Sequence, residues 1–284
     1  MHVHTLTCFS ARPGSGNPAL VIEHAAPDAA ARQALARECN MTCVFIDEDG
    51  DTIRVDYFYP HMRSPLCLHA TLAVAAVLFA RRGAPAAIAV RTAMKDQRLE
   101  LSREGGDYFV RLAAQPVPEV DMSVEQVAAL LGTSLSAAPR VASVGSPKLL
   151  AEVADPGTLH ALRPDLAAIS DWGRQAGVNG IYAWCRRPDG AFEGRNFNHL
   201  DPALEDSATG VAAGALSVAL RHGLVLRQGK ATGRDCLIRT RLDGDALLVG
   251  GSAEYAAASF QSNNQKHSQL PALLYSSALR PSSA

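Results

Sequence analysis

Short segments in which apolar and polar residues alternate are separated along this chain by longer segments with the spacing of a helix. Alternation over about four to eight residues is typical of strands with one buried face. Helices are predicted over residues 29–38, capped by Asp28, and from Ser123 to about residue 131, where Ser123 and Gln126 form a capping box. A further helix is predicted over residues 164–169. The predicted strands and extended runs are residues 2–9, 19–23, 42–47, 52–58, 87–92, 98–102, 108–112, 140–144, 148–153, 180–187, 193–198, 236–241 and 246–249.

Two alanine-rich stretches, residues 67–83 and 206–223, each predict a short polar turn that opens into a buried helix. The two stretches align without a gap, and in this alignment Ala73 corresponds to Ala213. A strand, a turn and such a helix in each half predict a duplicated domain. A helix N-terminus offers unpaired N–H groups and the positive end of a dipole, so two such ends at one cleft would hold a small carboxylate. Two unrelated alanine-rich helices are the alternative interpretation, since alanine is an ordinary helix former.

The length of 284 residues suffices for two domains with ordinary cores. Pro116 and Pro118 mark the predicted boundary between them. The sequence therefore predicts an N-terminal α/β domain over residues 1–115 and a C-terminal α/β domain over residues 116–260. Residues 261–284, which are polar and then rich in Ser, Ala and Leu, are predicted to form a peripheral tail.

The composition excludes several classes of protein. A formal net charge of −1 and an aromatic content of 6% give no basis for binding nucleic acid or an anionic membrane surface. No apolar run approaches the ~20 residues that span a bilayer, and no signal peptide is visible, so a cytoplasmic location is expected. The six cysteines contain no CxxC pair, so neither a zinc ribbon nor a disulfide framework is predicted. Phosphate loops, dinucleotide-binding glycines, HExxH and GxSxG are also missing from the sequence.

The openings of the two alanine-rich helices carry candidates for proton chemistry. At the first opening, Cys67 and His69 are candidates because a helix N-terminus biases a thiol toward its charged form and orients an imidazole. A buried structural cysteine is the alternative for Cys67. At the second opening Asp206 is the candidate, with N-capping as its alternative role, and Ser207 occupies the position of Cys67.

Two further polar residues lie close to predicted element ends. Cys43 stands at a junction between a helix and a strand, where a buried thiol that opens the strand is the alternative interpretation. Asn17 stands in a stretch dense in Gly and Pro, where its amide would reach a bound carboxylate or would only complete a turn.

A series of motifs extends over residues 1–259: Phe9 with SGNPALV at 15–21, FYP at 58–60, LCLHATLA at 66–73, RNF at 195–197, EDSATG at 205–210 and GR at 233–234. In this order they resemble the PhzF phenazine-biosynthesis-like isomerase family of the diaminopimelate-epimerase-like superfamily. The resemblance implies an α/β fold of two pseudo-symmetric domains, each a curled sheet or barrel around a central helix, with the active site between them. It also implies a cofactor-independent, often dimeric enzyme that moves protons on small carboxylic or amino acids. His69 and Asp206 fall on the family's substrate-contacting His and Asp.

Three positions depart from the pattern of that family. Leu68 replaces the glycine between the motif's Cys and His, and Val211 replaces a serine after Thr209 and Gly210. The family's acid–base glutamate has no counterpart in NMTCVF at residues 40–45. A positioned acid or base contributes about 10²–10⁴-fold in rate. Either a thiol takes its place or the activity is reduced, altered or lost.

The sequence as a whole predicts a cofactor-independent isomerase or epimerase, with a biosynthetic role, that acts on a small amino or carboxylic acid in the inter-domain cleft. No metal is predicted, and the expected partner is a second copy of the chain in a homodimer. The alternative is a catalytically altered or inactive family member that keeps the fold and acts as a small-molecule-binding or accessory protein. The predicted catalytic residues are Cys43, Cys67, His69 and Asp206, and the predicted substrate-binding residues are Asn17, His69, Ala70, Ser207, Thr209 and Gly210.

Overall fold

The computed structural model describes residues 1–83, 85–198 and 205–256 and divides the chain into two compact units. Unit 1 comprises Met1–Cys8, Pro18–Tyr108 and the described residues from Ala253 onward. Unit 2 comprises Phe9–Asn17 and Phe109–Ser252. Strand β8 (Asp107–Ala113) contains the point at which the chain passes from the first unit to the second. The tail predicted over residues 261–284 lies outside the described residues, and the domain limits predicted from the sequence stay a prediction.

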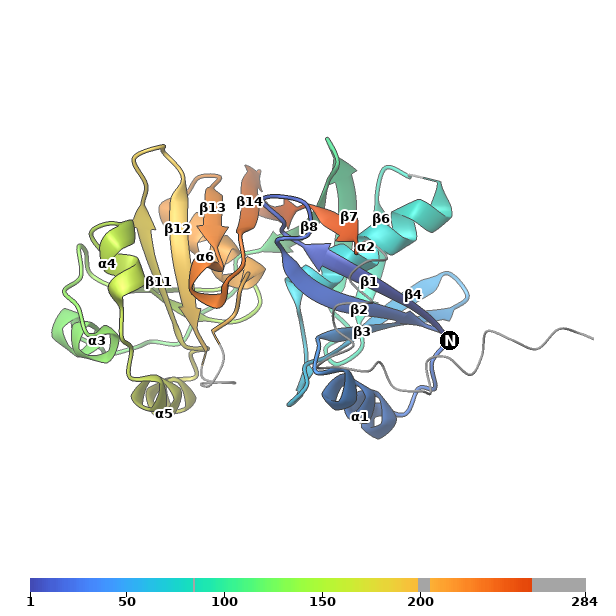
Figure 1. The fold of residues 1–284 in the computed structure, drawn as a ribbon, viewed down its shortest axis with the longest axis horizontal. Coiled ribbons are helices and arrows are strands. Elements are labelled where there is room, and N and C mark those ends of the chain that lie inside the picture. Colours follow the sequence, from blue (N-terminus) through green and yellow to red (C-terminus); the bar gives the residue numbers. More distant parts are fainter. Residues whose placement is uncertain (84, 199–204, 257–284) are drawn as a thin grey trace, which may run out of the picture. The chain divides into compact units, whose positions relative to one another are not determined.

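Unit 1 is a mixed sheet around one central helix, α2 (Leu68–Arg82) (Figure 1). Hydrogen bonds order its strands β16-β1-β2-β3-β4-β6-β7, and β5 pairs with β4. Helix α2 packs against strands from across this sheet, namely β1, β3, β6, β7 and β16. The remaining elements are β1 (His2–Cys8), β2 (Asn17–Glu23), α1 (Ala29–Cys39), β3 (Cys43–Asp49), β4 (Thr52–Phe58), β5 (Arg63–Ser64), β6 (Ile88–Thr92), β7 (Arg98–Glu104) and β16 (Ala253–Tyr255).

Unit 2 repeats this plan around α6 (Gly210–Leu220). Its strands are ordered β15-β14-β13-β12-β11-β10-β9, and α6 packs against β9, β10, β14 and β15. The remaining elements are α3 (Val124–Leu131), β9 (Arg140–Ala142), β10 (Lys148–Glu152), α4 (Pro156–Ala161), α5 (Leu166–Ala176), β11 (Ile181–Arg186), β12 (Phe192–Phe197), β13 (Val225–Gln228), the 3₁₀ turn η1 (Lys230–Thr232), β14 (Cys236–Asp243) and β15 (Ala246–Gly251).

The strand directions of the two units match pair by pair. In unit 1, β2 runs parallel to β3, β3 antiparallel to β4, β4 parallel to β6 and β6 antiparallel to β7. In unit 2, β10, β11, β12, β13 and β14 repeat the same succession. The row Leu20, Cys43, Phe58 across three strands of unit 1 therefore corresponds to Leu149, Ile181, Phe197 in unit 2. The duplicated α/β fold predicted from the alanine-rich stretches is confirmed.

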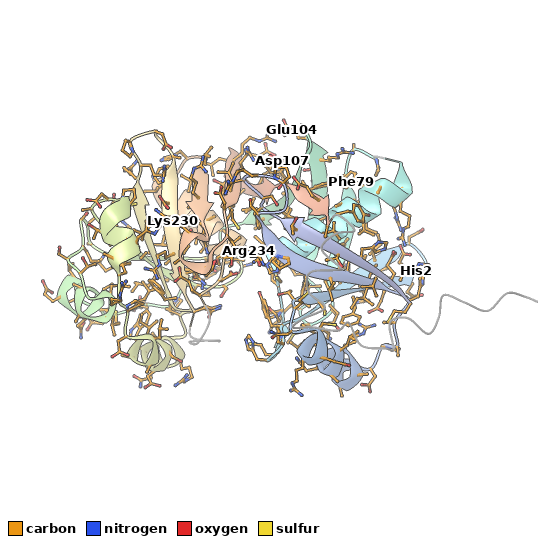
Figure 2. The ribbon with its side chains drawn as sticks, in the orientation of Figure 1. His2, Phe79, Glu104, Asp107, Lys230 and Arg234 are labelled. Atoms are coloured by element: carbon orange, nitrogen blue, oxygen red, sulfur yellow. The ribbon has the colours of Figure 1, made fainter. Side chains whose placement is uncertain are left out.

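Small side chains allow each central helix to lie deep against its sheet. Every residue of α2 from Leu68 to Phe79 is buried, and in α6 Gly210 and the segment Ala212–Ser217 are buried. At Gly214 a Cβ atom would lie 2.7 Å from Val144 Cγ2, which is too close for any other residue unless the helix or the Val144 side chain shifts. The Phe79 side chain of α2, labelled in Figure 2, has its ring 6.0 Å from that of Tyr108.

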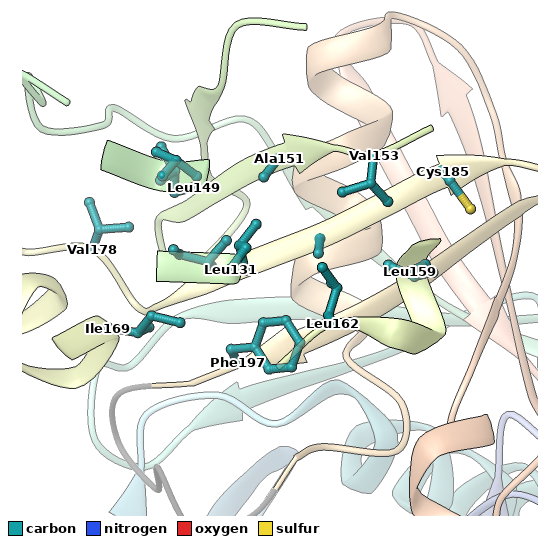
Figure 3. Packing of buried hydrophobic residues seen from close by; sticks show 13 residues of the cluster. Leu131, Leu149, Ala151, Val153, Leu159, Leu162, Ile169, Val178, Cys185 and Phe197 are labelled. Carbon is teal, nitrogen blue, oxygen red and sulfur yellow. The ribbon is translucent and has the colours of Figure 1, made fainter. Parts of the chain in front are cut away.

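The opposite face of each sheet has its own apolar core. In unit 2, alternate residues of β10 and β11 pack with residues of α3, α4 and α5, and Phe197 of β12 belongs to the same cluster (Figure 3). In unit 1 a smaller cluster joins β2, β3 and β4 to Ala36 and Cys39 of α1. These two cores leave the other face of each sheet to the central helix. Within the part of the chain that the structure describes, no helix is long and apolar enough to cross a bilayer.

Most predicted elements are confirmed, and the misses have local causes. Helix α1 is capped by Asp28, and α3 carries the capping box of Ser123 and Gln126. The helix predicted to end at residue 169 continues as α5 to Ala176, where Gly177 in the left-handed region ends it. The sequence analysis missed α4, which Asp155 caps ahead of a proline at the first helical position, and the strand β13.

Candidate functional site

The N-terminus of α2 brings a thiol and an imidazole together. Cys67 is the N-cap residue, and its side chain makes no capping hydrogen bond. Its Sγ lies 3.3 Å from Nδ1 of His69, and the two residues are only 3% and 4% exposed. A thiol within hydrogen-bond reach of an imidazole is the arrangement in which the imidazole accepts the thiol proton and leaves a thiolate.

Two hydroxyl groups fix the backbone of this helix end. Thr71 Oγ1 donates to the carbonyl oxygen of Cys67 at 2.8 Å, and Tyr57 Oη lies 2.7 Å from the same Thr71 oxygen. Burial raises the pKa of Tyr57 well above its usual range, and the nearby Cys67 and Asp56 raise it further. Tyr57 therefore stays a neutral hydrogen-bonding group that holds Thr71 and, through it, the turn at Cys67.

At the N-terminus of α6, the Asp206 carboxylate is held by two side chains. Thr209 Oγ1 donates to Oδ2 at 2.6 Å, and Asn17 Nδ2 donates to Oδ1 at 3.2 Å. The helix was predicted to open at Ser207, but it begins at Gly210 with Thr209 as N-cap and without a side-chain capping bond. The capping alternative for Asp206 is therefore wrong, because its carboxylate bonds mainly to the side chains of Thr209 and Asn17 instead of to the first helical N–H groups.

Gln228 of β13 connects this helix end to the sheet. Its Nε2 donates to the Asp206 carbonyl oxygen at 2.7 Å and to Thr209 Oγ1 at 3.0 Å. Its Oε1 accepts from the Thr209 backbone N–H at 3.2 Å and from the Tyr182 hydroxyl at 3.1 Å. The Tyr182 ring has room because position 194 is glycine, where a Cβ atom would lie 2.1 Å from the hydroxyl oxygen. The helix end is thus fixed by a polar network.

The segment before Asp206 is anchored by a two-pronged ion pair. Arg195 of β12 donates from Nε and Nη2 to the two carboxylate oxygens of Glu205, at 2.9 and 2.7 Å. Its Nη1 donates to the carbonyl oxygen of Leu159 at 3.0 Å. Both side chains are largely buried, so this pair is geometrically well defined and orients the backbone that leads into Asp206.

The other predicted substrate-binding residues lie at the same two helix ends. Ala70 is buried in the first turn of α2, where backbone N–H groups have no carbonyl partner four residues earlier. Gly210 is the first residue of α6, and Ser207 Oγ lies 2.8 Å from Thr232 Oγ1. The structure thus gathers Asn17 and Thr209 around the Asp206 carboxylate.

Cys43 lies in a different environment. It opens β3 and packs with Cys39, Ala36 and Phe58 in the core between the sheet and α1. A hydrogen bond with the neighbouring Cys39 thiol and burial both raise the pKa of Cys43 far above its usual range. Its thiolate is disfavoured, which makes Cys43 a poor candidate for a base.

Lys148 and Asn196 in unit 2 were missed by the sequence analysis. Lys148, the first residue of β10, is 1% exposed, and burial lowers its pKa to about 7 although the charge of Asp206 opposes the shift. Asn196 of β12 is fully buried, and neither polar atom of its side-chain amide has a hydrogen-bond partner among the described residues. One signal was available for Lys148, since Gly145-Ser146-Pro147-Lys148 repeats Gly16-Asn17-Pro18-Ala19. Within the described ranges no three His, Cys, Asp or Glu residues gather in a metal-binding arrangement.

Comparison with known proteins identifies relatives of this chain. A family model described as phenazine biosynthesis-like protein, PhzC-PhzF, matches residues 6–258. The uncharacterized isomerase YddE of Salmonella typhimurium is 30% identical over 244 residues, which cover 80% of this chain and 82% of that protein. The trans-2,3-dihydro-3-hydroxyanthranilate isomerase of Pseudomonas chlororaphis is 30% identical over 268 residues, covering 86% of this chain and 91% of that protein.

Solved structures agree with this comparison. The structure of a protein described as a predicted epimerase from Pseudomonas aeruginosa has a TM-score of 0.74 and 27% identity, and covers 90% of this chain and 96% of its own. A hydroxyproline epimerase from Agrobacterium vitis, with bound trans-4-OH-L-proline, has a TM-score of 0.55 and 10% identity, with 90% of each chain covered. At that identity the second likeness shows the fold alone.

Proposed function

Because the chain belongs to the PhzC-PhzF family of phenazine biosynthesis-like proteins, we propose that it moves a proton on a small amino or carboxylic acid without a cofactor. The resemblance predicted from the sequence is confirmed, and the chain is an isomerase or epimerase of the PhzF type. A biosynthetic role, a homodimer and a cytoplasmic location stay predictions.

The contact between Cys67 and His69 is the single observation that carries the proposal. The sequence analysis predicts no counterpart of the family's glutamate in residues 40–45, and we infer that another group serves as base. Cys67 Sγ lies 3.3 Å from an imidazole nitrogen at a helix N-terminus, whereas Cys43 is buried beside a second thiol in a core. We assign the role of base to Cys67, with His69 as the group that accepts and returns the thiol proton.

The proposed reaction follows from these roles. His69 takes the thiol proton, and the Cys67 thiolate then removes a proton from the carbon next to the substrate carboxylate. The first N–H groups of α2, which include that of Ala70, stabilise the negative charge that develops. The His69 imidazolium then returns its proton to the substrate carbanion, which restores the neutral Cys67–His69 pair. Asp206, held by Thr209 and Asn17, orients the substrate during these transfers, and Ser207 and Gly210 contribute to carboxylate binding. That both helix ends act on one substrate stays a prediction.

Deuterium wash-in from heavy water into a panel of small amino and hydroxy acids tests this proposal. The wild-type protein is expected to exchange at least one acid above the rate without protein, and Cys67→Ala to lower that rate by about 10²–10⁴-fold. Cys43→Ala decides between the two thiols, because an equal loss in that variant would move the base to Cys43. No exchange with any acid would overturn the proposal. Thermal stabilisation by the same acids without exchange would favour a binding protein.

A further inference from the structure

The side-chain amide of Gln228 has only one orientation that its neighbours allow. The Thr209 backbone N–H is a donor, so the Gln228 atom that lies 3.2 Å from it has to be the oxygen Oε1. The Asp206 backbone carbonyl is an acceptor, so the Gln228 atom that lies 2.7 Å from it has to be Nε2. The Tyr182 hydroxyl donates to the same Oε1 at 3.1 Å, and burial raises the pKa of Tyr182 well above its usual range, so this donor keeps its proton.

The orientation of Gln228 fixes the direction of the Thr209 hydroxyl. A hydroxyl has one hydrogen to donate and two lone pairs that accept. Because Gln228 Nε2 donates to Thr209 Oγ1 at 3.0 Å, the hydroxyl hydrogen has to point elsewhere. Within the part of the chain that the structure describes, its one acceptor is Asp206 Oδ2, at 2.6 Å. The hydrogen bonds therefore run in one direction, from Tyr182 and Gln228 through Thr209 to the Asp206 carboxylate.

Burial makes this direction costly to change. Tyr182, Gln228 and Thr209 are all buried, and a buried donor without an acceptor loses the free energy of its hydration without compensation. If Asp206 turned away, the Thr209 hydroxyl hydrogen would lose the acceptor that it has among the described residues. The other carboxylate oxygen, Oδ1, accepts from Asn17 Nδ2 at 3.2 Å, so donors hold both oxygens.

Unit 1 shows that the position of Thr209 is equivalent to that of His69. In the alignment in which Ala73 corresponds to Ala213, Thr209 corresponds to His69. His69 Nδ1 lies 3.3 Å from Cys67 Sγ, and Thr209 Oγ1 lies 2.6 Å from Asp206 Oδ2. In each unit, the residue at this position contacts the side chain to which the proposed function gives a role. Only in unit 2 does a residue of the sheet, Gln228, set the direction of that contact.

We propose that Gln228 is a positioning residue for Asp206 that acts through the hydroxyl of Thr209. By keeping the hydroxyl hydrogen directed at Oδ2, Gln228 holds the carboxylate in the place from which it orients the substrate. The consequence for catalysis rests on the proposed function, whereas the connection between the three side chains is measurable without any substrate.

A mutant cycle on stability tests this connection. Gln228→Met and Asp206→Ala, alone and combined, are unfolded with urea in the wild-type chain and in Thr209→Val. Gln228 contacts Asp206 directly only at the backbone carbonyl, which Asp206→Ala leaves in place. The two substitutions are therefore expected to be coupled in the wild-type chain and to lose this coupling in Thr209→Val. Coupling that persists in Thr209→Val, or is missing in the wild-type chain, would overturn the proposal.

A second substitution keeps the cycle usable if Gln228→Met does not fold. Gln228→Glu keeps the shape and the acceptor that Thr209 and Tyr182 require, but its carboxylate has no hydrogen to donate to Thr209 Oγ1. The same loss of coupling in Thr209→Val is expected with Gln228→Glu, and coupling that persists there would equally overturn the proposal.

The wash-in experiment carries the inference to catalysis. With any acid that exchanges, Gln228→Met and Thr209→Val are each expected to lower kcat by up to about 10²-fold and to change KM less, because a displaced carboxylate misplaces the substrate. The double variant should be no slower than Gln228→Met alone, since both changes interrupt the same series of bonds. Thr209→Ser, which restores the hydroxyl, should recover most of the loss. Losses that multiply in the double variant would overturn the proposal.

Another buried hydroxyl in unit 2 provides the matched control. Thr240 Oγ1 donates to Ser217 Oγ of α6 at 3.0 Å and accepts from the Leu224 backbone N–H at 2.8 Å. Thr240→Val is expected to lower the free energy of unfolding about as much as Thr209→Val does, but to leave kcat unchanged. Equal kcat values in these two variants would show a merely structural role for Thr209 and overturn the proposal. If the wild-type protein exchanges no acid, the proposed function fails, and the stability cycle still decides on Gln228.

Discussion

The two central helices occupy equivalent places in their units, but the side chains at their N-terminal ends differ in kind. The end of α2 presents a thiol and an imidazole, and hydroxyls of Tyr57 and Thr71 fix its backbone. The end of α6 follows a carboxylate that Thr209 and Asn17 hold. Because the strand order and directions around the two helices match, the difference lies at the helix ends, where the side chains differ and α6 begins two residues later than α2 in the aligned stretches. The duplicated scaffold has been kept, and its chemistry has diverged at the few positions beside each helix end.

The divergence extends to the sheet beneath each helix. Tyr57 on β4 and Asn196 on β12 occupy corresponding positions, because Phe58 corresponds to Phe197. Tyr57 meets the hydroxyl of Thr71, whereas the residue of α6 that matches Thr71 in the alanine-rich stretches is Val211. The unpartnered Asn196 amide thus lies in the half whose helix lacks the hydroxyl.

Replacement of the Asp206 carboxylate should have the largest effect. Asp206→Asn keeps the shape and the hydrogen bond from Thr209 but removes the charge, and is expected to lower exchange by about 10²–10⁴-fold. Rates of deuterium incorporation measure the change, with the exposed Asp243→Asn as the control. Unaltered exchange in Asp206→Asn would confine the chemistry to Cys67 and His69.

Removal of the buried Lys148 amine is expected to have the second-largest effect, a change in stability. The pKa of Lys148 is about 7 in the folded chain against an ordinary 10.5, so the unfolded chain binds more protons between these values. The wild-type free energy of unfolding should therefore rise with pH from about 7 to about 10.5, with the full penalty present at lower pH. The free energy of unfolding of Lys148→Met should exceed that of the wild type by ~2–5 kcal/mol near pH 7 and should not rise with pH between about 7 and about 10.5. Urea titrations across the pH range will measure both changes. A parallel pH dependence in both proteins would contradict a buried amine.

The smallest expected effects have opposite signs in the two halves. Asn196→Leu removes two buried polar atoms without partners and should raise the free energy of unfolding by ~1–3 kcal/mol. Tyr57→Phe removes a hydroxyl that bonds to Thr71 and should lower it by ~0.5–1.5 kcal/mol. Thermal unfolding of each variant and of the wild type measures the two changes in stability. Destabilisation by Asn196→Leu would show that the amide is satisfied in solution.

The duplication was predictable because burial against a sheet restricts many helix positions to small residues, and this constraint is visible in one sequence. The start of α6 was not predictable, because the N-cap depends on Gln228, which lies on a strand that the sequence analysis missed. Cys43 carries no local sign of which sheet face it occupies. The burial of Lys148 follows from the register of β10 with β11. A lysine at a strand start does not reveal this burial, and the repeated Gly-x-Pro before Ala19 and Lys148 marks only that the two positions correspond.

Each unit includes a segment from the far end of the chain. The stretch Phe9–Asn17, which supplies the Asn17 amide to Asp206, is synthesised long before the rest of unit 2. Strand β16, which pairs with β1, is made only after unit 2 is nearly complete. Neither half can therefore reach its final structure on the ribosome until almost the whole chain has emerged. Cutting the chain at the boundary near Tyr108 would leave an unpaired edge at β1 in one fragment and deprive the other of Asn17.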